Sequence, residues 1–113
     1  MACPFCEIVA GRIPAKTVYE DDQLLAFHDA APQAPTHVLV IPRRHMTSLL
    51  DLEPKDDALV GALVRTGRNI AREMGFAERG FRLVLNCGED AGYSVHHIHL
   101  HLLAGRKLGW PPG

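Results

Sequence analysis

The chain has 113 residues, a formal net charge of −1 and 47% hydrophobic residues, and charges of both signs are mixed along it. A chain of this length buries about two-thirds of the surface that its unfolded form exposes, so it can form a hydrophobic core. The charge gives no electrostatic basis for binding nucleic acid, and no apolar run approaches the roughly 18 residues of a membrane span. We therefore expect a single domain over residues 1–113 whose partners include neither nucleic acid nor a membrane.

Hydrophobic spacing along the chain predicts two helices and several strands. Phe5, Ile8 and Val9 fall at helical spacing before Gly11, and the long helical pattern ends at Gly75, where glycine suits a C-cap. The expected elements are a short helix at 3–10, strands at 17–20, 23–28, 37–41 and 81–86, and a long helix at 54–74. The apolar run at 37–41 is typical of a strand covered on both faces, so we place it at the centre of the sheet.

The stretch from His97 to Leu103 alternates histidine with apolar residues and predicts one further strand. On a strand this spacing places His97, His99 and His101 on one face, close enough to serve one ligand. Neutral imidazole is a nucleophile, and its protonated form suits an anionic oxygen, so the pattern favours phosphoryl chemistry. A metal-binding strand and a strand of hydrogen-bonded structural histidines remain as alternatives.

These elements together predict an α+β fold with an antiparallel sheet of about five strands, one long helix and a short N-terminal helix. One helix covers only one face of a sheet, so we expect a homodimer. Residues 105–113, which end in Trp110-Pro111-Pro112-Gly113, are expected to form an extended tail. The three cysteines fit a reducing compartment, and the N-terminus has no signal-peptide pattern, so we expect a cytoplasmic protein.

Several segments resemble the histidine-triad (HIT) family, and specifically its nucleoside phosphoramidase or Hint branch. The matching segments are Ser94–Leu103, Ile13–Lys16, Ala26–Asp29, Pro32–His37, Val40–Pro42 and Trp110–Gly113. The resemblance covers nearly the whole chain. It implies a HIT-like fold, a homodimer whose two sheets join, and a purine nucleotide of the AMP or GMP type bound at each triad.

The resemblance also implies a reaction, the hydrolysis of AMP linked through nitrogen to an amine. It makes His99 the nucleophile and His101 a partner of a phosphate oxygen, places Ser94 beside the departing amine, and includes His97 in the catalytic triad. For the nucleotide it implies contacts from Asp29 to the ribose and from Asn86 near the phosphate. The residues that it assigns to the purine pocket are Phe5, Ile8, Phe27 and His28, and it makes Trp110 reach across the dimer. Read alone, Phe5, Ile8 and Phe27 would be ordinary core residues.

Cys3 and Cys6 have a spacing that allows two thiolates to bind one zinc ion. The family resemblance supplies two further ligands, His45 and His97, with His96 as an alternative to His97. We expect a structural zinc at these positions and no cofactor in the chemistry itself. Cys87 has no partner in the sequence and is expected to be a small buried or loop thiol.

Two positions differ from the family pattern. Tyr93 stands where glutamine is usual, which bears on leaving-group preference, and His96 stands where an aromatic residue is common. Two other functions remain open: a nucleotide-binding regulatory or scaffold protein with little turnover, and a dinucleotide polyphosphate hydrolase or nucleotidyl transferase of a sister branch.

Overall fold

A five-stranded antiparallel sheet forms the centre of the protein, in a computed structural model that describes residues 3–113. The strands are β1 (Thr17–Glu20), β2 (Leu24–His28), β3 (Thr36–Pro42), β4 (Arg82–Leu85) and β5 (Leu100–Ala104), in the order β1-β2-β3-β5-β4. The helices are α1 (Pro4–Val9) and α2 (Asp57–Glu73), with 3-10 turns at Leu49–Asp51, Pro54–Asp56 and Glu89–Ala91. The predicted α+β class and its main elements are confirmed.

The strand β3 lies in the middle of the sheet, as its apolar sequence predicted. It pairs with β2 on one side and with β5 on the other, and six of its seven residues are buried. The preceding hairpin begins its second strand at Leu24, one residue later than expected. The reason is local: the carboxylate of Asp21 accepts hydrogen bonds from the backbone N–H groups of Gln23 and Leu24, both at 2.8 Å, and so extends the turn.

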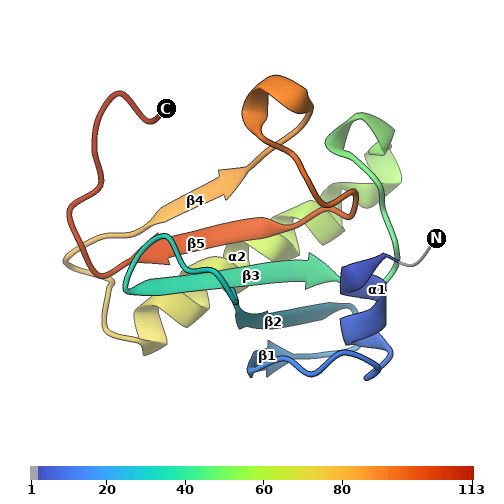
Figure 1. Ribbon diagram of the computed structural model, residues 1–113, viewed down its shortest axis with the longest axis horizontal. Helices are drawn as coiled ribbons and strands as arrows, with labels where there is room; N and C mark the ends of the chain where they lie inside the picture. Colours follow the sequence, from blue (N-terminus) through green and yellow to red (C-terminus); the bar gives the residue numbers. More distant parts are fainter. Residues whose placement is uncertain (1–2) are drawn as a thin grey trace.

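The long helix α2 covers the far face of the sheet in Figure 1. A reciprocal capping box between Glu53 and Asp56 precedes it, and Pro54 occupies a first-turn position. Leu63 and Ile70 are buried against the sheet, and Gly67 allows close approach, because a Cβ atom there would lie 3.1 Å from the Leu100 side chain. Among residues 3–113 no helix has the length and apolar character needed to cross a bilayer.

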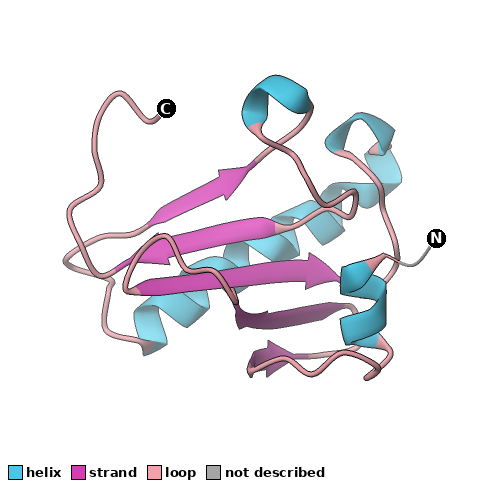
Figure 2. Cartoon of the chain, viewed as in Figure 1, coloured by secondary structure: helices cyan, strands magenta, loops and turns pink. Residues whose placement is uncertain are grey.

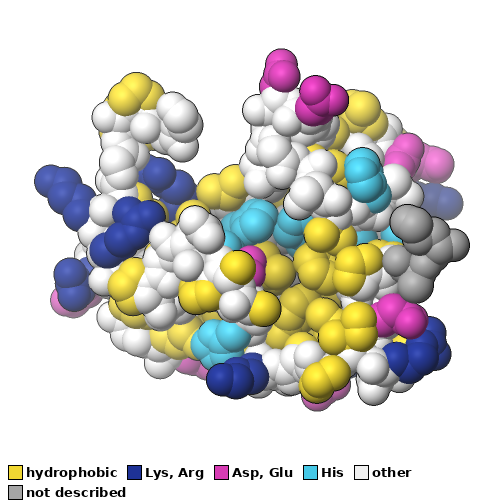
Figure 3. Space-filling view, viewed as in Figure 1, with side chains coloured by type: hydrophobic (Ala, Val, Ile, Leu, Met, Phe, Trp, Pro, Cys, Tyr) yellow, Lys and Arg dark blue, Asp and Glu magenta, His cyan; other side chains and the backbone are white. Residues whose placement is uncertain are grey.

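The near face of the sheet is covered by α1 at one end only. Phe5 of this helix joins Leu25, Phe27, Leu39 and Ile41 in a second apolar cluster. The rest of the face is hollowed, and histidine side chains gather in the hollow among hydrophobic ones (Figure 3). The fold therefore leaves one partly open face of the sheet, bordered by α1.

The histidine stretch differs from the expectation in one respect, because β5 begins only at Leu100. Before it, the backbone N–H of Ile98 donates to the carbonyl of Met46 at 2.7 Å, and that of His97 donates to Val95 at 3.0 Å. These contacts replace a regular ladder. The rings of His97 and His99 are consequently not placed by strand alternation alone.

Candidate active site

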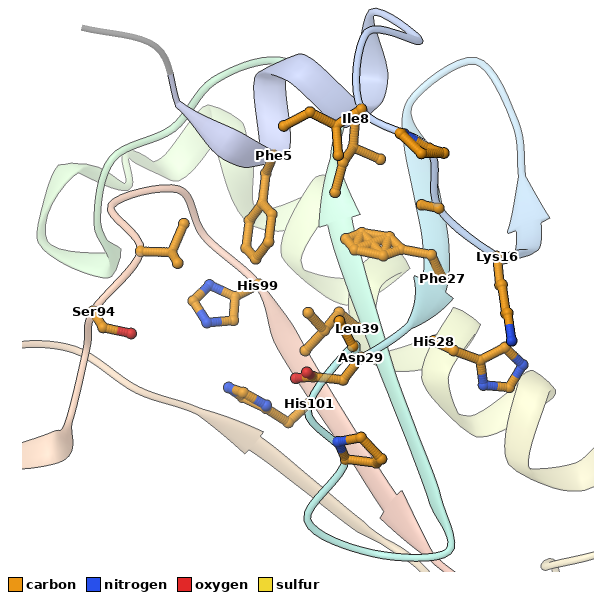
Figure 4. A pocket seen from close by; sticks show the side chains of 16 residues that line it. Phe5, Ile8, Lys16, Phe27, His28, Asp29, Leu39, Ser94, His99 and His101 are labelled. Atoms are coloured by element: carbon orange, nitrogen blue, oxygen red, sulfur yellow. The ribbon is translucent and has the colours of Figure 1, made fainter.

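A cavity of about 1060 Å³ opens on the near face of the sheet. Apolar side chains from α1, β2 and β3 form one wall, among them Phe5, Phe27 and Leu39, while His99, His101 and Asp29 lie together beside it (Figure 4). Ser94 lies on the opposite side of His99 from Lys16 and His28. A pocket with an apolar wall and a few converging polar groups is typical of a small-molecule site.

The ring of His99 is held in one tautomer. Its Nδ1 lies 2.7 Å from the carbonyl oxygen of His97, and a carbonyl can only accept, so Nδ1 carries the proton. Nε2 then keeps its lone pair. Phe5 packs edge to face against the ring with centroids 5.1 Å apart, and the whole residue is only 8% exposed.

A chain of hydrogen bonds fixes the ring of His101 in the opposite tautomer. The backbone N–H of Gln33 donates to Nδ1 of His37 at 3.0 Å, so the proton of His37 is on Nε2. That nitrogen lies 2.9 Å from Nδ1 of His101 and 3.4 Å from a carboxylate oxygen of Asp29. His101 therefore accepts at Nδ1 and carries its own proton on Nε2.

Burial keeps these imidazoles neutral. It lowers the pKa of His99 and of His37, and it lowers the pKa of His101 to about 4, with the neighbouring His99 and His37 adding to the effect. At neutral pH the group thus offers one lone pair and one N–H donor rather than positive charges. This arrangement suits attack at a phosphorus atom together with a hydrogen bond to its oxygen.

A second cluster joins α1 to the segments around His45 and His97. Its four potential ligand atoms, from Cys3, Cys6, His45 and His97, lie within 4.8 Å of one another. Nδ1 of His97 is 3.4 Å from Sγ of Cys3 and 3.6 Å from Sγ of Cys6, and Nδ1 of His45 is 3.3 Å from Sγ of Cys6. The structure therefore brings together all four residues that the sequence proposed as ligands.

This cluster fits a tetrahedral zinc ion. Zinc bound by two sulfur and two nitrogen atoms has ligand separations of about 3.3 to 3.8 Å, which match the three distances above. Nε2 of the fully buried His97 donates to the carbonyl of Pro42 at 2.8 Å, so Nδ1 faces the thiols with its lone pair. A metal-bound histidine usually has such a partner on its outer nitrogen. His96 is exposed and lies outside the cluster.

Most of the predicted nucleotide contacts line the cavity. They are Phe5, Ile8, Phe27, His28, Asp29 and Ser94, together with His99 and His101. Three others do not line it: Asn86 follows β4, Trp110 is 83% exposed on the tail, and His97 turns toward the cysteines. Of the three triad rings, those of His99 and His101 line the cavity, whereas the ring of His97 contacts Cys3 and Cys6; a catalytic role for His97 stays a prediction.

His37 is a site residue that the sequence reasoning missed, since it was counted only as the start of the central strand. A usable signal exists, namely a histidine at the edge of an otherwise apolar run. In the observed register Leu39 pairs with His101, and His37 is two residues away on the same face. The cavity is also lined by the segment Ile13–Lys16, one of the segments on which the family resemblance rests.

Comparisons with known proteins agree with this geometry. The HIT domain family model matches residues 10–108. A HIT family hydrolase of Legionella pneumophila, known as a crystal structure, superposes with a TM-score of 0.97 at 46% identity, covering 99% of this chain and 100% of that one. The 14 kDa zinc-binding protein of Brassica juncea is 44% identical over 96% of this chain and 97% of its own length. Adenylylsulfatase HINT1 of Arabidopsis thaliana is also 44% identical, over 96% of this chain and 75% of its own.

Proposed function

The chain belongs to the HIT domain family, and on that premise we propose that it hydrolyses the P–N bond of purine nucleoside 5′-phosphoramidates through a nucleotidyl intermediate on His99. The observation that carries the proposal is the tautomer of His99. Its Nδ1 proton is held by the His97 carbonyl at 2.7 Å, which leaves the Nε2 lone pair for attack. A binding protein does not need this arrangement.

In the first step Nε2 of His99 attacks the α-phosphorus and the P–N bond breaks. The leaving nitrogen keeps the electron pair of that bond and takes up a proton, which Ser94 at the exposed end of the cavity relays from solvent. Since His99 keeps its Nδ1 proton, the nucleotidyl-histidine is an imidazolium cation. In the second step water attacks phosphorus, the P–Nε2 bond returns its electrons to the ring, and the proton of water goes to solvent.

His101 and His37 assist both steps without changing their own charge. The proton on Nε2 of His101 donates to a non-bridging phosphate oxygen, where negative charge develops. His37 supports it by donating to Nδ1 of His101 at 2.9 Å, which keeps the proton on the nitrogen that faces the phosphate. His37 is thus a positioning residue rather than one that touches the substrate.

The nucleoside lies at the other end of the cavity in this proposal. The carboxylate of Asp29 accepts from the ribose hydroxyls, and the base packs among Phe5, Phe27 and His28. The aromatic wall supports a purine ring, whose large flat surface is the best match for it.

The cysteine cluster holds a structural zinc ion in this proposal. Cys3, Cys6, His45 and His97 supply the ligands, and a relative with zinc in its name supports the assignment. The ion would tie α1 to the segment that carries His99. We assign it no part in bond making or breaking.

We also propose that two copies pair through the edge of the sheet at β4. This strand is at one end of the strand order, so its outer backbone groups have no partner within residues 3–113. All four of its side chains are half-buried already. The exposed Trp110 would then reach toward the site of the second copy.

A single-turnover assay with an adenosine phosphoramidate that releases a fluorescent amine tests the function. Wild type should release the amine, with a transient gain of one AMP on the peptide containing His99, and His99→Ala should do neither. If wild type binds AMP tightly but releases no amine, the protein is a binding module and the proposal fails.

Adenylylsulfate hydrolysis is a second candidate, favoured by the name of the Arabidopsis relative. The same nucleophile would attack the same phosphorus, and only the leaving group would change from an amine to sulfate. The ratio of kcat/KM for the two substrates decides between them.

A further inference from the structure

Tyr93 stacks directly on the proposed nucleophile. Its ring and that of His99 are nearly parallel, with centroids 5.7 Å apart and an interplanar angle of 14°. The residue follows the 3-10 turn Glu89–Ala91, and its hydroxyl donates a hydrogen bond to the carbonyl of Thr47. Its backbone N–H also donates to Gly88 at 3.2 Å. Tyr93 is therefore anchored through its hydroxyl and its backbone N–H, and its ring lies nearly parallel to the imidazole in an offset stack.

This contact is separate from the substrate cavity. Ser94 and His99 line the cavity, whereas Tyr93 does not. Phe5 meets the same imidazole at a steep angle of 77°, so the two aromatic rings hold the imidazole in different ways. Burial raises the pKa of the Tyr93 phenol, which keeps its ring neutral at physiological pH. His99 is the cavity-lining residue on which the Tyr93 ring stacks.

The charge of the His99 imidazole changes during the proposed reaction, so the strength of its interaction with the Tyr93 ring changes as well. Free His99 is neutral, but nucleotidyl-His99 is a cation because Nδ1 keeps its proton. The face of an aromatic ring attracts a cation within about 6 Å of its centroid, and more strongly where water is excluded. The glutamine that the family resemblance leads us to expect at this position has no such face.

We propose that Tyr93 is a positioning residue that stabilises the cationic nucleotidyl-His99 by stacking on it. This inference rests on the proposed function, because it requires the covalent intermediate. Stabilising the cation favours the step that forms it and slows the step that consumes it. Loss of the ring should therefore shift the two rate constants in opposite directions, whereas loss of a merely structural contact should slow both.

The test compares Tyr93→Phe with Tyr93→Leu. Both variants lack the hydroxyl, so the bond to Thr47 is lost in each, and only the leucine variant also lacks the ring. Rapid-quench measurements give the rate constants for amine release and for AMP release. Relative to Tyr93→Phe, we expect Tyr93→Leu to form the adduct more slowly and to hydrolyse it faster, lowering the ratio of the two constants by about 3- to 30-fold.

Two other results would overturn the inference. Equal constants in the two variants, or a slowing of both steps, overturns the inference while leaving the phosphoramidase function intact. If wild type forms no adduct, the proposed function fails and the inference fails with it. Should Tyr93→Leu not fold, as judged by its thermal denaturation, Tyr93→Met provides an unbranched apolar replacement for the same comparison.

Discussion

Two clusters of histidine with acidic or thiol partners lie side by side in this protein, and they are built for different tasks. One contains Cys3, Cys6, His45 and His97, and the other contains Asp29, His37 and His101. In both, the candidate ligand atoms lie within 4.8 Å of one another. Residue type and distance alone would therefore make either a metal site.

The outer ring nitrogens separate the two clusters. His97 donates its outer N–H to the Pro42 carbonyl, so its inner nitrogen meets the thiols with a free lone pair. In His37 the roles are reversed: Nδ1 accepts from the backbone N–H of Gln33, and Nε2 carries its proton toward Nδ1 of His101. A metal ion at His37 would have to displace that proton. The backbone partner of each ring therefore decides whether it serves as a ligand or as a proton donor.

The largest effect is expected on kcat, when one histidine is removed from each site in turn. His99→Ala removes the nucleophile and should lower kcat by at least about 10⁴-fold, while zinc content stays unchanged. His45→Ala removes an exposed ligand and should lose zinc, with a fall in kcat of only roughly 10-fold, since it acts through the neighbouring His97. Steady-state kinetics and metal analysis on both variants test this. Equal losses of activity in the two would mean that the clusters do not have separate tasks.

Removing the metal should have the next largest effect, and on stability. Wild type purified without chelator should hold about one equivalent of zinc, and free zinc at a hundred times its Kd adds about 3 kcal/mol to the unfolding free energy. A strong chelator should therefore lower Tm by roughly 10 °C. The same change should follow Cys6→Ser but not Cys87→Ser, because Cys87 lies outside the cluster. Well-folded protein with less than about a tenth of an equivalent of zinc would contradict the assignment.

The pH dependence of the unfolding free energy should reveal the lowered pKa of His101 in the second cluster. His101 has a folded-state pKa of about 4, below the ordinary value of about 6.5 in an unfolded chain. Between these values the unfolded state binds more protons, so the unfolding free energy falls as the pH falls. From pH 7 to pH 5 the loss should be about 2 kcal/mol. Urea denaturation at both pH values should show a smaller loss for His101→Gln, and an equal loss in the two proteins would refute the buried, neutral state of His101.

The smallest effect on stability is expected far from both clusters, at the tail. Trp110 is 83% exposed, and the contact of the tail with the sheet includes one hydrogen bond from Arg82 to the carbonyl of Gly109 at 2.8 Å. Deleting residues 109–113 should change the unfolding free energy by less than about 1 kcal/mol. If the tail reaches the site of a second copy, the deletion should nevertheless change the preference among amine leaving groups. Unaltered kinetics with several amines would show that the tail does not contribute to the site.

The fold was predictable from the sequence because local patterns and burial agree. The apolar run of β3 predicted a strand covered on both faces, and the helical patterns end at Gly11 and Gly75, which have φ values of +80° and +89°. The limits of the elements shifted by up to three residues, through the side chain of Asp21 in the first hairpin and through backbone contacts before β5. Such contacts depend on turn geometry rather than on periodicity.

The candidate site was only partly predictable. The alternating histidines and the paired cysteines are visible in the sequence, whereas the separate roles of His97 and His99 came only from the family resemblance and not from the residue pattern. In the structure the ring of His97 meets the carbonyl of Pro42, far away in the chain, whereas the ring of His99 meets the carbonyl of His97. The role of His37 likewise requires the register of β3 against β5.

Side-chain ¹⁵N NMR of histidine-labelled protein at neutral pH tests the central claim most directly, because it reads the proton on each ring nitrogen. We expect His99 to be protonated at Nδ1 with a bare Nε2, and His101 to be protonated at Nε2 with a bare Nδ1. Signals are assigned by their loss in His99→Gln and His101→Gln. A proton on Nε2 of His99 would contradict the account, since the proposed nucleophile would then have no lone pair with which to attack.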